Sequence, residues 1–302
     1  MFRQLPDAER QRRRAPYAMI APAVIYLLAF LAYPMGEGLR LSVTDTGLLN
    51  PRQGRFVGLD NYVTALTSGD ITRVLSVTLF YAAASVAITV VLGVIAAAVM
   101  NRPFPGRTLI RSAVTIPWTT PQVAVALVFA WMFNNQYGVI NYLLTTFGLT
   151  DHYHRWLDNV DLAMPAVLAT TVWMIFPFTA LVLLAAMQSI PEDLYESARI
   201  DGADPLNQFR AVTLPAIAPT LLVVTAFLSI WAIRRFEVIW LLTQGGPAQT
   251  TSTLVVDLYR QAFRLRRLGY AAAIGIVGVA LAAIVAAGFV WAEARRKKAA
   301  DA

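Results

Sequence analysis

The sequence predicts an all-α integral membrane protein with six transmembrane helices. Three observations support this fold class: 57% of the residues are hydrophobic, only 14% are charged, and the charged residues avoid six long stretches. A helix that crosses the hydrocarbon layer needs about 20 mostly apolar residues, and each stretch is at least that long. The charge-free stretches are 15–36, 74–101, 112–150, 162–191, 211–233 and 268–292.

The first apolar stretch follows Arg10 and the basic run Arg12–Arg14, as the core of a secretory signal would. The stretch from Pro16 to Gly36 is longer than the core of a signal, and no clear small-residue cleavage site follows it. We therefore expect an uncleaved first span. Basic residues near both ends, Arg12–Arg14 and Arg295–Lys298, predict that both termini are cytoplasmic, because cytoplasmic segments carry an excess of lysine and arginine.

Prolines four residues apart occur in the third span, as Pro117 and Pro121, and in the fifth span, as Pro215 and Pro219. Proline removes a backbone donor and can kink a helix. In lipid, a broken backbone must be satisfied by neighbouring helices or a wet cavity. The pattern therefore fits bent helices that line a cavity, and it also fits routine shaping of membrane helices.

The apolar pattern of the fifth span continues past Arg234 and Arg235 as far as Leu242. An unbroken helix over 212–242 would be about 46 Å long at 1.5 Å per residue. That length exceeds the thickness of the hydrocarbon core. If the helix is unbroken, both arginines lie within the membrane rather than beyond it.

The chain is expected to form one domain, because its longest predicted loops are under 40 residues. We divide it into a cytoplasmic basic N-terminal segment (1–15), a six-span transmembrane domain (16–292) with a cytoplasmic hairpin (189–211), and a cytoplasmic basic tail (293–302). The net charge of +7 suits contact with anionic lipid headgroups rather than with nucleic acid.

The composition excludes several kinds of chemistry. The chain has no cysteine, and its two histidines, His152 and His154, lie in a polar loop without a third ligand, so we predict no metal site. The only lysines are Lys297 and Lys298, so the P-loop that holds nucleotide phosphates does not occur. We expect no catalytic residues and no cofactor, and any ATP chemistry must belong to a partner.

The segment between the fourth and fifth spans predicts two short helices around a glycine. Ser189 can cap the first helix, with Glu192 three residues later completing a capping box. Gly202 suits a chain reversal, and Asp204 followed by Pro205 suits the start of the second helix. The mixed apolar and charged surface fits docking on a soluble partner, and it equally fits a helix that rests on lipid headgroups.

This segment resembles the cytoplasmic loop of binding-protein-dependent ABC importer permeases. Their signature is Glu-Ala-Ala, three residues, Gly, nine residues and Ile-x-Leu-Pro, and this chain has Glu196-Ser197-Ala198, Gly202 and Val212-Thr213-Leu214-Pro215 at matching spacing. Serine for alanine and valine for isoleucine are mild departures. The likeness is to the carbohydrate branch, similar to the maltose and glycerol-phosphate permeases, and extends to Tyr33-Pro34, Val57–Tyr62, Leu242–Pro247 and Tyr259–Phe263.

The resemblance implies a permease subunit of an ATP-driven importer for a sugar or sugar-like solute, in the bacterial inner (plasma) membrane. It implies four kinds of partner: a second permease, expected to form a heterodimer, two cytoplasmic ATPase subunits, an extracytoplasmic solute-binding protein and membrane lipid. The hairpin would be the coupling helix, with Glu196 as polar anchor, Ala198 as close-contact point and Gly202 as the turn. The implied coupling residues are Glu196, Ser197, Ala198, Asp201, Gly202 and Ala203.

The resemblance also points to sugar contacts around Trp173–Phe178 in the fourth span and Leu228–Phe236 in the fifth. The implied substrate-binding residues are Met174, Ile175, Phe178, Leu228, Trp231, Ala232 and Arg235. Aromatic residues in membrane spans also serve as packing residues or interface anchors. Packing is therefore the alternative role for Phe178 and Trp231.

Arg234 and Arg235 depart from the similar maltose permease, which has asparagine at the matching positions. A membrane arginine is costly and usually functional, and its planar fork suits a carboxylate or phosphate. We therefore predict that the pair contacts an anionic or highly hydroxylated substrate. Glu237 could instead form an ion pair with Arg234. An ion-coupled secondary transporter built on Arg234, Arg235 and Glu237 is the alternative function, although five of the six spans contain no charge.

Overall fold

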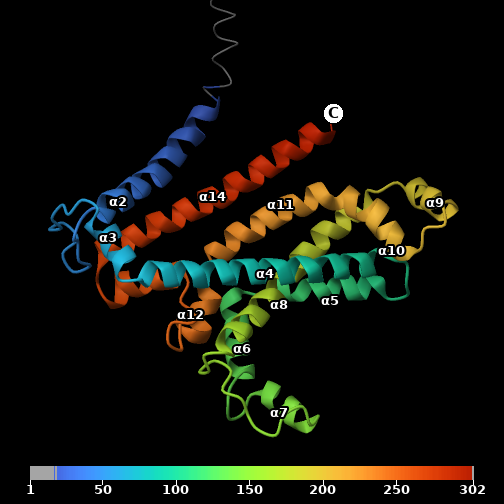
Figure 1. The fold of residues 1–302 in the computed structure, drawn as a ribbon, viewed down its shortest axis with the longest axis horizontal. Coiled ribbons are helices and arrows are strands. Elements are labelled where there is room, and N and C mark those ends of the chain that lie inside the picture. Colours follow the sequence, from blue (N-terminus) through green and yellow to red (C-terminus); the bar gives the residue numbers. More distant parts are fainter. Residues whose placement is uncertain (1–16, 18, 301–302) are drawn as a thin grey trace, which may run out of the picture.

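The computed structural model describes residue 17 and residues 19–300, and within them the chain is almost entirely helical (Figure 1). Five helical segments are long and apolar enough to cross a membrane, and a sharply bent helix pair makes a sixth. The five are Met19–Ser42, Asp70–Asn101, Ala163–Gln188, Pro205–Ile233 and Leu268–Lys298, and the pair is Arg107–Thr119 with Gln122–Met132. The prediction of an all-α membrane fold with six spans is confirmed.

Three short π-helical segments continue neighbouring α-helices. In chain order the elements are η1 (Leu28–Ala32), α2 (Tyr33–Ser42), α3 (Asp60–Thr67), α4 (Asp70–Asn101), α5 (Arg107–Thr119), α6 (Gln122–Met132), α7 (Val139–Thr146), α8 (Ala163–Gln188), α9 (Glu192–Ile200), α10 (Pro205–Gln208), η2 (Phe209–Thr213), α11 (Leu214–Ile233), α12 (Glu237–Thr243), α13 (Leu254–Tyr259), η3 (Arg260–Arg264) and α14 (Leu268–Ala300).

Five of the predicted spans match an observed one, with ends that differ by up to six residues. The third span, predicted within 112–150, is bent rather than straight: α5 and α6 meet at 95°, and α7 is a separate short helix. Pro121 explains the bend: it offers no N–H, and it forces Thr120 into an extended conformation with ψ 134°. The predicted basic segment 1–15 lies outside the described residues.

Helices α4 and α8 form the centre of the bundle (Figure 1). They approach closely because Gly93 has no side chain: a Cβ there would lie 2.5 Å from Cγ2 of Thr179 and 3.3 Å from the backbone nitrogen of Ala180. Further along the same interface, the hydroxyls of Tyr81 and Thr171 share a hydrogen bond of 2.9 Å, and both residues are fully buried. Small residues and paired hydroxyls thus let two long apolar helices pack without voids.

The fifth span ends at Ile233 and the chain resumes as a helix only at Glu237. The possibility of an unbroken helix over 212–242 is therefore excluded, and Arg234 and Arg235 lie in the break. On the other side, α10, η2 and α11 run together as one helical segment over 205–233. This segment starts in the predicted hairpin and ends at the break.

The hairpin between the fourth and fifth spans has the predicted two helices, α9 and α10. Gly202 has a φ of +81°, as a left-handed turn residue requires, and Asp204 caps α10 by accepting a 2.7 Å hydrogen bond from the backbone N–H of Asn207. The predicted capping box is wrong. The Ser189 hydroxyl donates to the carbonyl oxygen of Ala186 at the end of α8 instead, because α9 begins three residues later.

A buried asparagine holds together the segment that contains α7. The Asn141 side chain is fully buried and donates through Nδ2 to the carbonyl oxygen of His154, at 2.9 Å. Its Oδ1 accepts from the backbone N–H of His154, at 3.1 Å, and from Nε1 of Trp156, at 2.9 Å. One amide thereby pairs three groups that would otherwise be left without partners away from water.

Replacing Asn141 with leucine keeps the branched shape of the side chain and removes all of these bonds. Each buried polar group left unpaired costs about 1–3 kcal/mol, so we expect the segment 135–161 to open. Limited proteolysis of the purified protein should cleave this segment at least about tenfold faster than in wild type. Tyr142→Leu, at a neighbouring residue that is 59% exposed, is the matched control and should leave cleavage unchanged. Equal protection of both variants would contradict this role of Asn141.

Candidate functional site

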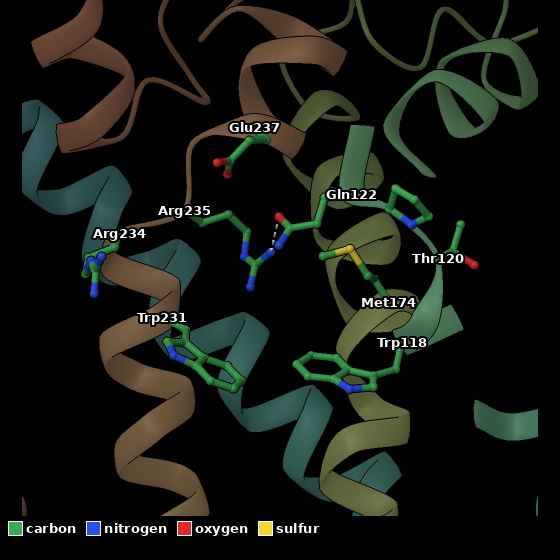
Figure 2. Close-up of a pocket in the computed structure, with 9 residues that line it drawn as sticks. Trp118, Thr120, Gln122, Met174, Trp231, Arg234, Arg235 and Glu237 are labelled. Atoms are coloured by element: carbon green, nitrogen blue, oxygen red, sulfur yellow. Dashed lines mark hydrogen bonds between the residues drawn. The ribbon is translucent and has the colours of Figure 1, made fainter. Parts of the chain in front are cut away.

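A cavity of about 460 Å³ lies where the break between α5 and α6 faces the break between α11 and α12 (Figure 2). In membrane proteins, irregular backbone is tolerated where it is buried in protein or lines a cavity. Two interrupted helices that face each other are therefore the expected walls of such a space. The lining residues are Trp118, Thr120, Pro121, Gln122, Met174, Trp231, Arg234, Arg235 and Glu237.

One wall of the cavity is aromatic. Trp118 from α5 stacks on Phe178 from α8, with ring centroids 4.8 Å apart, and lies 5.8 Å from the ring of Trp231 from α11. Phe178 and Trp231 complete the cluster at 5.3 Å. Figure 2 shows Trp118 and Trp231 on the same side of the cavity. Three helices thus present a continuous aromatic surface.

The opposite side of the cavity is polar and cationic. Arg235 is only 8% exposed, and its side chain reaches across the cavity toward Gln122 (Figure 2). One terminal nitrogen of Arg235 donates to Oε1 of Gln122 at 3.3 Å, while Nε has no hydrogen-bond partner. The side chain of Arg234 points away from Arg235 in the same view. Within the described residues, Arg234 and Glu237 form no salt bridge, so the alternative of an internal ion pair is not observed.

Four of the predicted substrate residues line this cavity: Met174, Trp231, Arg234 and Arg235. Phe178 contributes to the aromatic wall behind Trp118 and Trp231. The remaining three are packed in the hydrophobic core between α8 and α11, where each is at most 5% exposed: Ile175, Leu228 and Ala232. The structure thus brings residues of the fourth and fifth spans together, as predicted, and separates those that face the cavity from those that face the core.

In the third span the proline pattern indicated Pro121, which lines the cavity, but no pattern in the sequence indicated its neighbours Trp118, Thr120 and Gln122 by themselves. Trp118, Thr120 and Gln122 come from the two sides of the α5–α6 bend. The signal for them is indirect, because Pro117 and Pro121 predict a bent helix that could line a cavity. The residues next to those prolines are therefore the candidates that this signal indicates for lining the cavity.

The predicted coupling residues lie on the hairpin, at the opposite end of α11 from α12 (Figure 1). Helix α9 contains no buried residue. Among the coupling residues, Ala198 and Ala203 are half-buried and the others are exposed. Three large apolar side chains beside them also face outward: Leu194, Ile200 and Leu206, with exposed fractions of 50%, 87% and 55%. The hairpin thus presents a mixed apolar and polar surface that the rest of the chain does not cover.

A hydrogen bond ties the hairpin to the fifth span. The hydroxyls of Tyr195 on α9 and Thr213 at the end of η2 are 2.9 Å apart. Thr213 is 6% exposed and immediately precedes α11. The bond fixes α9 to the base of the helical segment that leads to the cavity.

The loop that follows α12 is fixed by a polar network that is partly exposed. Oε1 of Gln249 accepts hydrogen bonds from Arg73 at the start of α4 and from Arg260 in η3, both at 3.2 Å. Arg260 also pairs with Asp257, which is 1% exposed. Burial raises the pKa of the Asp257 carboxyl above its ordinary value, while the guanidinium of Arg260 acts in the opposite direction. The network holds the loop against α4.

Comparison with known proteins gives consistent results. Residues 89–298 match the model of the binding-protein-dependent transport system inner membrane component. The chain is similar to the inner membrane ABC transporter permease protein YcjO of Escherichia coli K12, with 37% identity over 88% of this chain and 90% of that protein. It is 33% identical to the trehalose/maltose transport system permease protein MalF of Thermococcus litoralis, over 86% of this chain and 87% of that protein.

A solved structure has the same fold. It is a chain from a bacterial ABC transporter involved in the import of the acidic polysaccharide alginate, with a TM-score of 0.81 and 26% identity over 95% of this chain and 98% of that chain. The family match includes the hairpin motif, the bent third span from α5 onward and the break in the fifth span. The resemblance predicted from the hairpin motif is therefore confirmed, and the chain belongs to the family of binding-protein-dependent transport system inner membrane components.

Proposed function

We propose that this chain is the transmembrane permease subunit of an ATP-driven, binding-protein-dependent importer for a sugar or sugar-like solute. The cavity between the two helix breaks receives the solute in transit. The hairpin transmits movement from a separate cytoplasmic ATPase, on which hydrolysis takes place. The chain moves its solute by alternating access and makes no covalent change in it.

One observation carries this proposal: a single helical segment, 205–233, connects the two sites. It begins in the hairpin with α10 and ends at Ile233, directly before the arginines of the cavity. The hydrogen bond between Tyr195 and Thr213 fixes α9 to its base. An ATPase that displaces the hairpin would therefore also displace one wall of the cavity.

The relatives support a saccharide as the solute. The similar permeases include one named for trehalose and maltose and one named for sulfoquinovosyl glycerol. Similar solved structures belong to a transporter of alginate, in one case in complex with an alginate pentasaccharide-bound periplasmic protein. The aromatic wall of the cavity suits this class, because the C–H faces of a sugar ring pack on aromatic side chains while its hydroxyls need polar partners.

The partners and the orientation follow from the same proposal. A second permease, expected to be a different chain, would complete the path, and two ATPase subunits would take up the hairpins. With six spans, the hairpin 189–211 and the basic residues Arg295–Lys298 would lie on the same side of the membrane, and the positive charge of these basic residues favours the cytoplasmic side. The loop 242–247 then faces the solute-binding protein. Membership of a binding-protein-dependent family favours this arrangement over an ion-coupled carrier built on Arg234, Arg235 and Glu237.

The test is reconstitution of the chain with the ATPase, second permease and binding protein encoded beside it. ATP hydrolysis in proteoliposomes should rise when ligand-loaded binding protein is added on the outer side. Glu196→Ala should reduce this stimulation, because the predicted polar anchor is exposed and free to contact a partner. If the chain assembles with no ATPase, or transports solute on an ion gradient alone, the proposal fails.

The bond between hairpin and fifth span gives a second, milder test. Tyr195→Phe removes only the hydroxyl that meets Thr213, which costs about 0.5–1.5 kcal/mol. We expect the stimulated ATPase rate to fall about two- to tenfold while the amount of assembled complex stays the same. Tyr142→Phe, which removes an exposed hydroxyl far from the hairpin, should have no effect. A full rate in Tyr195→Phe would show that the hairpin transmits movement without this bond.

A further inference from the structure

The unusual group in the cavity is Arg235, a cation with no counter-ion among the residues that the structure describes. Its side chain is more than nine-tenths buried. Its one hydrogen bond within the cavity is a long one, 3.3 Å, to the neutral amide of Gln122, and its Nε is buried without any partner. Within the described residues, no carboxylate lies within salt-bridge distance of it.

A buried charge without a partner lowers the stability of the folded protein. Burying a charge is costly unless it is paired and hydrogen-bonded, and a membrane arginine that is retained usually faces a cavity and serves its ligand. Arginine has five N–H donors in a rigid fork that matches an anionic oxygen pair. The fork of Arg235 uses one of them weakly, and Figure 2 shows the guanidinium within the space between Gln122 and the tryptophans.

The two other charged residues of the cavity do not neutralise Arg235. Glu237 and Arg234 are both exposed and carry opposite charges, so together they add no net charge. The side chain of Arg234 points away from the fork of Arg235 (Figure 2). The net charge of the lining is therefore positive, and it is centred on the buried arginine.

We infer that the cavity selects sugars that carry an anionic group, with Arg235 as the residue that binds the anion. Trp118 and Trp231, which line the cavity and pack on Phe178, take the C–H face of the sugar ring, and the fork takes two oxygens of a carboxylate, sulfonate or phosphate on the ring's edge. A neutral sugar fills the same volume but leaves the guanidinium unpaired. This inference rests on the proposed function, because it concerns the solute of the same cavity.

Direct binding to the purified complex tests it without the selectivity of the binding protein. The complex of this chain with its second permease and ATPase subunits is titrated calorimetrically with two matched pairs of probes. Digalacturonate is compared with galactobiose, and glucose 6-phosphate with glucose. At least one acidic probe should bind about tenfold tighter than its neutral partner, as expected for charge-assisted hydrogen bonds, and its affinity should fall with added salt.

Two variants assign the effect to Arg235. Arg235→Gln should weaken the acidic probe about tenfold and leave the neutral probe within about twofold. Gln122→Glu keeps Arg235 and places a carboxylate beside its fork, so it should abolish the preference for acid while stabilising assembly. Arg102→Gln removes the same charge from an exposed loop residue outside the cavity and is the control.

The outcomes separate this inference from the proposed function. If only digalacturonate binds tighter than its neutral partner, the anionic group is a carboxylate. If only glucose 6-phosphate does, the group is a phosphate, and either result supports the inference. Equal binding of acidic and neutral probes, or equal losses for both probes in Arg235→Gln, overturns it. The same preparations report ATP hydrolysis stimulated by the loaded binding protein, so an intact stimulation with no acid preference leaves the importer assignment standing. If the chain joins no ATPase complex, both the proposed importer function and this inference are wrong.

Discussion

Replacement of Gly202 by valine is expected to reduce both the stimulated ATP hydrolysis and the solute uptake while the transmembrane bundle stays folded. Gly202 has a φ of +81°, which costs a β-branched residue about 1–3 kcal/mol. No atom lies within 4 Å of the position that a Cβ would take, so the expected defect is backbone strain alone. Relief of that strain should reorient α9 against α10 and disrupt the surface that we propose meets the ATPase.

The measurement is the rate of ATP hydrolysis with and without loaded binding protein, together with solute uptake. Both the stimulated rate and the uptake should fall at least about tenfold. Gly106→Val is the matched control, because Gly106 has a φ of +82° and an equally open surround in the loop between α4 and α5. Equal defects in both variants would mean that strain anywhere on this side is harmful, and the hairpin would lose its special role.

Replacement of Gly93 by alanine is expected to loosen the centre of the bundle. Alanine is favoured over glycine in a helix by about 1 kcal/mol, but its Cβ would lie 2.5 Å from Cγ2 of Thr179 on α8. Overpacking of this kind costs about 1–3 kcal/mol, so the clash should outweigh the gain. The thermal unfolding midpoint of the purified complex should fall by about 2–4 °C.

Two further variants identify the cause. Gly288→Ala makes the same substitution in α14, where no atom lies within 4 Å of the new methyl group, and should be neutral or slightly stabilising. Combining Gly93→Ala with Thr179→Gly removes the clashing side chain, so the two substitutions should be non-additive in a double-mutant cycle. Additive effects would show that α4 and α8 do not meet at these residues.

The sequence was a good guide to the spans, because a stretch without charge reports directly on the cost of burying charge in lipid. It did not show where a helix bends within a span. The stretch 112–150 is free of charge throughout, yet it holds a bend of 95° and a separate helix. The residues on both sides of Pro121 carry no charge, so the geometry of proline is what distinguishes a straight span from a broken one.

The cavity shows a second limit of prediction. Arg234 and Arg235 are adjacent in sequence and chemically identical, and the sequence analysis treated them as a pair. The structure separates them because α11 ends at Ile233: the side chain of Arg235 is buried and reaches toward Gln122, while that of Arg234 is exposed and points away from Arg235 (Figure 2). Trp118 and Gln122 escaped prediction for a related reason, since they join Arg235 from more than 100 residues away along the chain.

The segment 205–233 has a mechanical consequence. Its 29 residues span about 44 Å, so a tilt of about 5° at the hairpin would move its far end by about 4 Å. The segment would act as a lever. The π-helical turn η2 lies near its hairpin end, and Trp231 of the aromatic wall lies near its other end. The lever stops at the break before α12, and the Gln249 network anchors the loop beyond it. A displacement of the hairpin by the proposed ATPase would therefore move the cavity wall, while the loop after α12, on the other side of the membrane, would stay in place.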